Sequence, residues 1–208
     1  MKKIGKIISL IVVVLLLVVV GFYLYNNNQV TENKENINIE AGDYSELTED
    51  VIAEIGGQEI ADGLIEKYEK AVLDLDEAIQ KYEEGGKIEE DKPSVILFVE
   101  VGKYAKYIRK YEVAADVLES VFDYYEKSNI ALINLAHVYE DEGEFQKAID
   151  TYQRFYAMFP EENQFQFHVY IMQDFIALGN KEKVAELYKN YKDAGFANEE
   201  IEQYVSNL

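Results

Sequence analysis

The sequence resembles itself at an interval of 34 to 36 residues, and this periodicity constrains the fold more than any other feature of the chain. At an offset of 34, similar side chains coincide: Val101 with Leu135, Gly102 with Ala136, Tyr111 with Phe145, Ala114 with Ala148, and Leu118 with Tyr152. At an offset of 36, Leu135 coincides with Ile171, Tyr139 with Phe175, Gly143 with Gly179, Ala148 with Val184, and Tyr152 with Tyr188. Such an interval is typical of stacked supersecondary units. Because the chain contains only two prolines, which break helices, we predict an all-α fold built from helix pairs.

The middle unit, residues 129–162, has the most specific pattern. Its predicted first helix carries Leu132, Leu135, Ala136 and Tyr139, its turn is Glu142-Gly143-Glu144, its second helix carries Ala148 and Tyr152, and Pro160 follows. This unit resembles a tetratricopeptide repeat. The resemblance implies antiparallel helices that approach closely at Ala136 and Ala148, with Tyr139, Phe145 and Tyr152 filling the space between units. Units 95–128 and 165–196 match less closely, so the resemblance covers residues 95–196 and implies an α-α superhelix.

Further helices are predicted on both sides of the repeats, within residues 45–94 and 197–208. The first should have Ser45 as its N-cap and end at Gly56-Gly57. The second should run from Ala61 to Glu84 and carry a heptad seam: Leu64, Tyr68, Ala71, Leu75, Ala78 and Tyr82. This seam can pack on the next helix of the same chain or can join two copies of the chain. Asn198 can cap the last helix, which would cover the open end of the repeat array.

Residues 7–25 form an apolar run of 19 residues without a charge. A helix of that length spans roughly 28 Å, close to the hydrocarbon thickness of a bilayer. Lys2, Lys3 and Lys6 precede the run, so the positive-inside rule places the N-terminus in the cytoplasm and the C-terminal domain outside. We therefore expect residues 1–25 to anchor a single-pass cell-membrane protein and the polar residues 26–44 to form a linker. A cleaved signal peptide is the alternative, with Val19-Val20-Gly21 as a poor but possible cleavage site.

The composition excludes several classes of chemistry. The chain has no cysteine and therefore no disulfide, zinc–thiolate site or thiol nucleophile. Beyond the three N-terminal lysines, 17 basic residues stand against 40 acidic ones, a charge that repels nucleic acid. No catalytic or cofactor-binding motif occurs, so we expect neither enzyme activity nor a cofactor. His137 and Asp141 have a spacing that could hold a metal ion, but a histidine on a polar helix surface explains it better, so no metal site is predicted.

The resemblance also implies a binding surface, because in such repeats the first helix of each unit lines a concave groove. The matching positions are Ile96, Val99, Lys103, Lys106, Tyr107, Ile130, Ile133, His137, Glu140, Asp141, Gln166, Val169, Gln173 and Ile176. This mixture of apolar and polar side chains suits an extended peptide or an amphipathic helix. We therefore expect a membrane-anchored scaffold at the cell envelope that binds a segment of a protein partner. The alternative is a structural protein that self-associates through the Leu64–Tyr82 seam.

Overall fold

The computed structural model describes residues 44–45, 47–162 and 165–207. In these ranges the chain forms α-helices and two short 3-10 helices and no β-strand, which confirms the all-α prediction there. The predicted anchor, residues 1–25, and the linker up to residue 43 lie outside the described residues. Among the helices that are described, none combines the length and the apolar character needed to cross a membrane.

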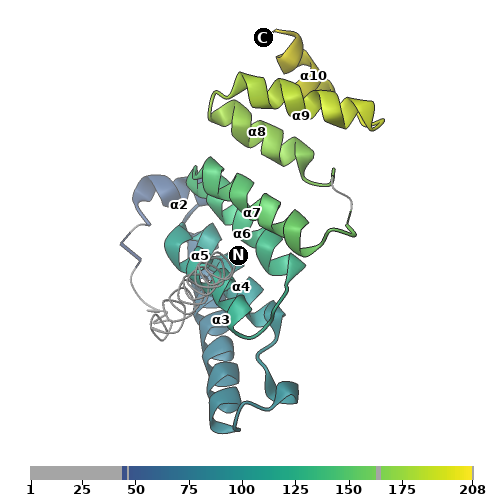
Figure 1. Ribbon diagram of the computed structural model, residues 1–208. Helices are drawn as coiled ribbons and strands as arrows, with labels where there is room; N and C mark the ends of the chain where they lie inside the picture. Colours follow the sequence, from purple (N-terminus) through teal and green to yellow (C-terminus); the bar gives the residue numbers. More distant parts are fainter. Residues whose placement is uncertain (1–43, 46, 163–164, 208) are drawn as a thin grey trace, which may run out of the picture. The chain divides into compact units, whose positions relative to one another are not determined.

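Three antiparallel helix pairs follow one another along the chain (Figure 1). They are α4 (Val95–Tyr107) with α5 (Tyr111–Ser120), α6 (Asn129–Glu142) with α7 (Phe145–Met158), and α8 (His168–Ala177) with α9 (Lys181–Asp193). Each pair packs on the next, and the first helices α4 and α6 also contact each other directly. After the third pair, α10 (Glu199–Ser206) packs on α9 and α8, with the Asn198 side chain accepting a hydrogen bond from the Ile201 amide as its N-cap.

Glycines make the turns of the second and third pairs. Gly143 and Gly179 have φ angles of 84° and 70°, in the left-handed region that only glycine enters without strain. In the middle pair, α7 ends at Met158, two residues before Pro160. The residue before a proline is disfavoured in the helical region, and Phe159 has an extended φ of −127°. The turn and the helix end of the middle unit therefore lie where its sequence pattern indicates.

Within the described part of residues 44–94, two α-helices precede the repeats, and both begin at other residues than predicted. The first, α2 (Glu49–Ile55), is capped by Thr48, whose hydroxyl accepts a hydrogen bond from the Val51 amide at 3.4 Å. The prediction of Ser45 as its N-cap was wrong, because the helix starts further along the chain, where the threonine hydroxyl caps it. The second, α3 (Gln58–Glu84), starts directly after Gly57 rather than at Ala61, and a short 3-10 helix, η1 (Glu89–Asp91), follows it.

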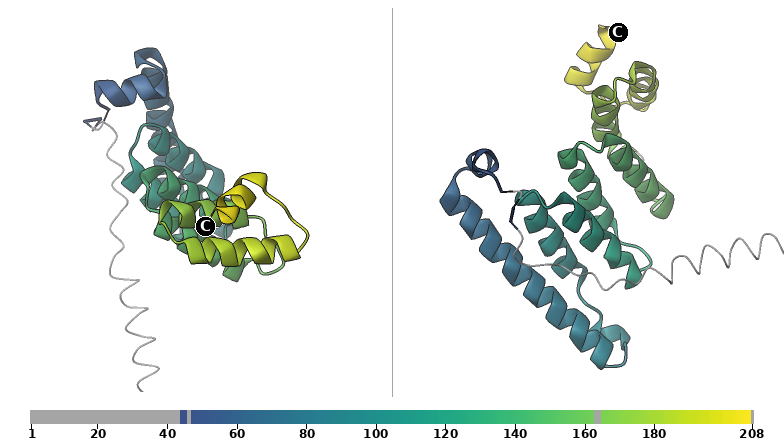
Figure 2. Two further views of the ribbon diagram at one scale, coloured as in Figure 1. Left: turned by 90° about the horizontal axis from the view of Figure 1, so that it is seen from above. Right: turned by 90° about the vertical axis from the view of Figure 1, so that its left-hand side faces the viewer.

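Helix α3 packs against α4, as the right-hand view of Figure 2 shows. The centre of the predicted seam, Tyr68, Ala71 and Leu75, is buried by this packing, whereas its ends are half-buried. Of the two interpretations of the seam, the structure favours packing within the chain. A dimer seam would need these same side chains at the surface. Because they are buried within the chain, they are not available for self-association.

The predicted linker also ends differently. Its last residue, Tyr44, donates a hydrogen bond from its hydroxyl to Oε1 of Glu69 at 2.7 Å, and the Lys110 ammonium lies 5.0 Å from the centre of its ring. Tyr44 therefore belongs to the folded part that contains α3 and α5, rather than to a solvated linker.

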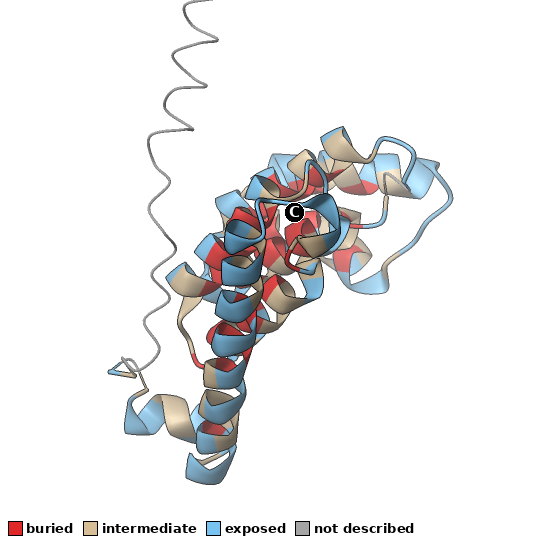
Figure 3. Cartoon of the chain, turned by 90° about the horizontal axis from the view of Figure 1, so that it is seen from below, coloured by how far each residue is buried: buried red, intermediate tan, exposed pale blue. Residues whose placement is uncertain are grey.

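Buried residues gather along the inner sides of the helices, shown in red in Figure 3. Ala136 and Ala148 are fully buried, as expected for the close approach of α6 and α7. Of the three aromatic residues predicted to fill the space between units, Tyr152 is buried, whereas Tyr139 and Phe145 are half-buried. The contact between the second and third pairs is made mainly of rings, with Tyr152 stacked on Phe167 at 4.9 Å between ring centres and Phe155 edge-on to Phe167 at the same distance.

Candidate partner-binding site

In the repeats, Leu178 and Phe196 are exposed in the segments that follow α8 and α9, and the exposed large apolar side chains within helices lie on the first helices of the pairs. In the described part of the chain these are Ile96 and Tyr107 on α4, Ile130 on α6 and Tyr170 on α8. The second helices α5, α7 and α9 expose no large apolar side chain among their described residues. Exposed apolar side chains that gather on one side of a soluble domain mark binding surfaces more often than scattered ones do. We call Ile96, Tyr107, Ile130 and Tyr170 the first-helix apolar set.

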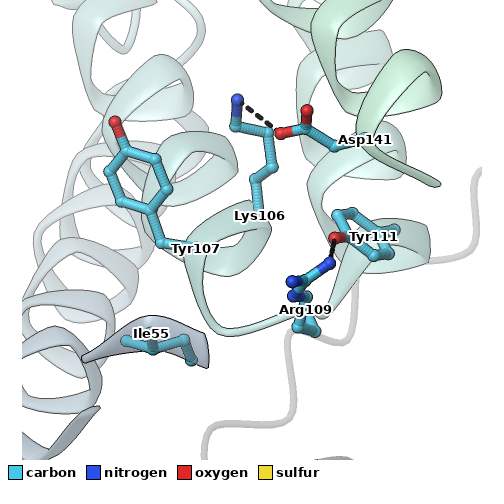
Figure 4. Close-up of a pocket in the computed structure, with 6 residues that line it drawn as sticks. All are labelled: Ile55, Lys106, Tyr107, Arg109, Tyr111 and Asp141. Carbon is cyan, nitrogen blue, oxygen red and sulfur yellow. Dashed lines mark hydrogen bonds and ion pairs between the residues drawn. The ribbon is translucent and has the colours of Figure 1, made fainter. Parts of the chain in front are cut away.

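A pocket of about 250 Å³ lies at one end of these first helices (Figure 4). Its lining residues are Ile55, Lys106, Tyr107, Arg109, Tyr111 and Asp141. The Lys106 ammonium forms an ion pair with Oδ2 of Asp141 at 2.8 Å, which ties the end of α4 to the end of α6. Three predicted site residues, Lys106, Tyr107 and Asp141, therefore come together here, although Asp141 lies in a different repeat from the other two.

The remaining predicted residues differ in how far they are exposed. Lys103, Ile130, Gln166 and Gln173 are exposed, and Gln166 lies in the turn before α8 rather than on a first helix. Val99 is half-buried. Ile133 packs against the core cluster of α6, α7 and α8, and Val169 and Ile176 pack against the C-terminal cluster around Met172. Ile133 and Val169 are half-buried against these clusters, and their assignment to the groove stays a prediction.

His137 sits between the second and third pairs, with its ring 5.7 Å from that of Tyr170. Burial lowers the pKa of His137, and the nearby Lys106 ammonium lowers it further, so the imidazole is neutral at pH 7. Within the described ranges, no group of three or more histidine or acidic side chains is placed to hold a metal ion. His137 is thus part of the contact between α6 and α8 rather than of a described metal site.

A buried carboxyl group, Asp174, and the half-buried Glu140 that acts on it were missed by sequence reasoning. Asp174 of α8 is only 3% exposed, and its Oδ2 has no hydrogen-bond partner. Burial and the carboxylate of Glu140 raise the pKa of Asp174 to about 7. Glu140 accepts a hydrogen bond from the Tyr152 hydroxyl at 2.8 Å, and burial raises its pKa also. The repeat alignment contained the signal, since an offset of 36 places Asp174 on the buried Val138.

A comparison of the chain with protein-family models gives one match, whereas comparisons with curated proteins and with solved structures give none. A family model of the tetratricopeptide repeat matches residues 131–158. These residues run from α6 to the end of α7 and form one complete helix pair, which is the unit with the most specific sequence pattern. The match supports a tetratricopeptide-like repeat at these residues, and the helix pairs on either side have the same helix–turn–helix arrangement. Repeats of this kind are typically non-catalytic modules for protein–protein interaction.

Proposed function

We propose that this chain is a scaffold that binds a protein partner through the first-helix apolar set and the adjoining pocket. The observation that carries the proposal is the distribution of exposed apolar side chains, which occur on α4, α6 and α8 and not on the described residues of α5, α7 and α9. Helix packing brings α4 and α6 side by side, so side chains some thirty residues apart in the sequence can contact one bound segment.

The test compares capture of a partner by full-length variants after crosslinking in cells. Tyr107→Ala combined with Ile130→Ala removes two exposed side chains of the first-helix apolar set, and we expect capture to fall at least about thirtyfold, the effect of losing roughly 2 kcal/mol at a hot spot. Ile133 is unsuitable for this test because it packs on the core. The matched control is Leu73→Ser, which removes an apolar side chain that is 67% exposed on α3. Equal capture by the double variant and the parent would refute the proposal.

We further propose that residues 1–25 anchor the scaffold in the cell membrane, with the N-terminus in the cytoplasm and the repeat domain outside. The support is the uncharged run at residues 7–25 and the three lysines before it. A reporter fused after Leu208 that works only when exported should be active. Activity of a reporter that works only in the cytoplasm would contradict this topology. Loss of about the first 21 residues from the mature protein would instead indicate the signal-peptide alternative.

A further inference from the structure

Arg109 occupies a turn position at which the other two repeats have glycine. It falls on Gly143 at an offset of 34 and, through Gly143, on Gly179 at a further 36. Its φ angle is 64°, in the same left-handed region as the two glycines, where a side chain with a Cβ atom is strained. A strained residue persists when its side chain makes contacts that outweigh the strain, so the contacts of Arg109 indicate what this position does.

The Arg109 guanidinium joins the first repeat to the short helix before it. One of its terminal nitrogens pairs with Oε2 of Glu54 at 2.8 Å, across 55 residues of sequence. The other donates a hydrogen bond to the Tyr111 hydroxyl at 2.6 Å, which fixes the direction of the guanidinium. Glu54 is the last residue but one of α2, and the next residue, Ile55, forms one wall of the pocket.

Helix α2 is short, and it contacts α3 as well as Arg109. It is seven residues long, and none of them is buried. A helix of this length is unstable by itself in water, so its contacts with the rest of the chain keep it in place. The ion pair between Arg109 and Glu54 is a weak tie, because both side chains are largely open to solvent, with 39% and 64% of their surface exposed. A competing carboxylate therefore has to break only a weak ion pair to reach Arg109.

We propose that this pocket is a docking site for a short segment of a partner protein in which an acidic residue precedes a branched aliphatic residue. In the absence of the partner, α2 supplies the corresponding groups, with Glu54 paired to Arg109 and Ile55 lining the pocket. The proposal deepens the proposed function and rests on it. The partner's carboxylate pairs with Arg109 as that of Glu54 does, and its aliphatic side chain enters the pocket that Ile55 and Tyr107 line in Figure 4.

Charge makes the pocket selective for such a segment. The chain as a whole has a net charge of −20, so an acidic segment is repelled from most of its surface. Lys106 and Arg109 stand together at the pocket, and each is already paired with a carboxylate, Asp141 or Glu54. An incoming carboxylate can replace that of Glu54 at Arg109, and the displaced Glu54 side chain, 64% exposed, is stabilised by solvent instead. Long-range repulsion combined with this one local attraction favours the pocket over other binding positions.

The experiment uses the chain's own sequence as the probe. A fluorescent peptide of residues 48–56, Thr-Glu-Asp-Val-Ile-Ala-Glu-Ile-Gly, is titrated with full-length protein, and binding is followed by anisotropy. In the parent, α2 competes at the high effective concentration of a tethered segment, so binding should be weak. Glu54→Gln combined with Ile55→Ser empties the site, and we expect the apparent affinity for the peptide to rise at least tenfold.

A third variant and a matched peptide identify the binding groups. Arg109→Gly, added to the emptied variant, removes the guanidinium but leaves a residue suited to the turn, as Gly143 and Gly179 show, so the helices should remain intact by circular dichroism. We expect this variant to lose the gain in affinity. A peptide with the Glu54→Gln and Ile55→Ser changes should bind none of the proteins above background.

The outcomes separate this inference from the proposed function. Unchanged peptide affinity in the emptied variant, or equal affinity after Arg109→Gly, overturns the docking site. Partner capture that depends on Tyr107 and Ile130 would still support the proposed function in that case. Partner capture that does not depend on Tyr107 and Ile130, together with peptide binding as expected, would overturn the assignment of the pocket to a partner. The pocket would then be a site that holds α2.

Discussion

At the scale of single residues, Gly102 illustrates how closely the helices of a pair approach. It is buried in α4, and a Cβ atom at this position would stand 2.8 Å from Cγ of Leu118 in α5. We therefore expect Gly102→Ala to destabilise the protein by about 1 kcal/mol. Overpacking costs roughly 1–3 kcal/mol, and the better helix propensity of alanine returns about 0.5–1 kcal/mol of it. The free energy of unfolding in urea measures the effect.

Gly63 provides the matched control, because it lies within helix α3 and a Cβ atom there would meet nothing within 4 Å. Gly63→Ala should stabilise the protein by roughly 0.5–1 kcal/mol through helix propensity and the smaller entropy of the unfolded chain. The two substitutions are chemically identical and should have opposite signs. A stabilising Gly102→Ala would show that α4 and α5 are further apart than described.

The residues that repeat along the sequence are the ones that predicted the structure. Gly143 and Ala148 perform geometric tasks, a left-handed turn and a close helix contact, which only a few residue types can perform. The contact between Glu54 and Arg109 is not periodic and depends on where α2 lies, so no sequence pattern could reveal it. Arg109 itself is visible in the repeat alignment as an exception, because it is an arginine at a turn position where the other two repeats have glycine.

At the scale of elements, the middle helix pair depends on the close approach of α6 and α7. Ala148 is fully buried at this contact, and the space around it is fixed by neighbouring helices. We expect Ala148→Trp to lower the free energy of unfolding by at least about 3 kcal/mol, since an indole cannot be accommodated without moving a helix. That loss is large against a total stability of roughly 5–15 kcal/mol, and thermal melting should show it.

The control for this change is on the opposite side of the same helix. Ala157 is exposed in α7, so Ala157→Trp adds the same side chain where there is room for it. It should cost no more than the difference in helix propensity, about 0.5 kcal/mol. Similar melting temperatures for the two variants would mean that α7 is rotated about its axis relative to the helix described above.

The packing around each first helix also explains why the candidate site was only partly predicted. The helices were expected from local patterns, but which side chains of a first helix remain exposed depends on the helices around it. Ile133 and Val169 were placed on the groove by alignment to a regular repeat, and both are half-buried against core clusters. In the third pair the first helix begins only at His168, after Gln166, so positions transferred from the middle unit no longer point the same way.

At the scale of the whole molecule, the second and third helix pairs meet around a buried carboxyl group. Asp174 of α8 lies next to Glu140 of α6, which in turn accepts a hydrogen bond from Tyr152 of α7. Two adjacent carboxyl groups out of water cannot both ionise cheaply, so one of them tends to keep its proton. The stability of this contact should therefore depend on pH through the carboxyl group with the higher pKa.

The sign follows from the two states of Asp174. Its pKa is about 7 in the folded protein against 3.8 for an unperturbed side chain, so the folded state binds the proton more tightly. The stabilisation is complete below pH 3.8 and is lost as the pH rises through 7. We expect Asp174→Asn, which cannot ionise, to become more stable relative to the parent by on the order of 2 kcal/mol between pH 5 and pH 8.

His137, with its lowered pKa, acts in the opposite direction in both proteins and cancels in the comparison. Asp193→Asn, at an exposed carboxylate of α9, is the control that makes the same chemical change at the surface. Urea unfolding of the three proteins across this range tests the claim, and a constant difference between parent and Asp174→Asn would show that Asp174 does not change its protonation on folding.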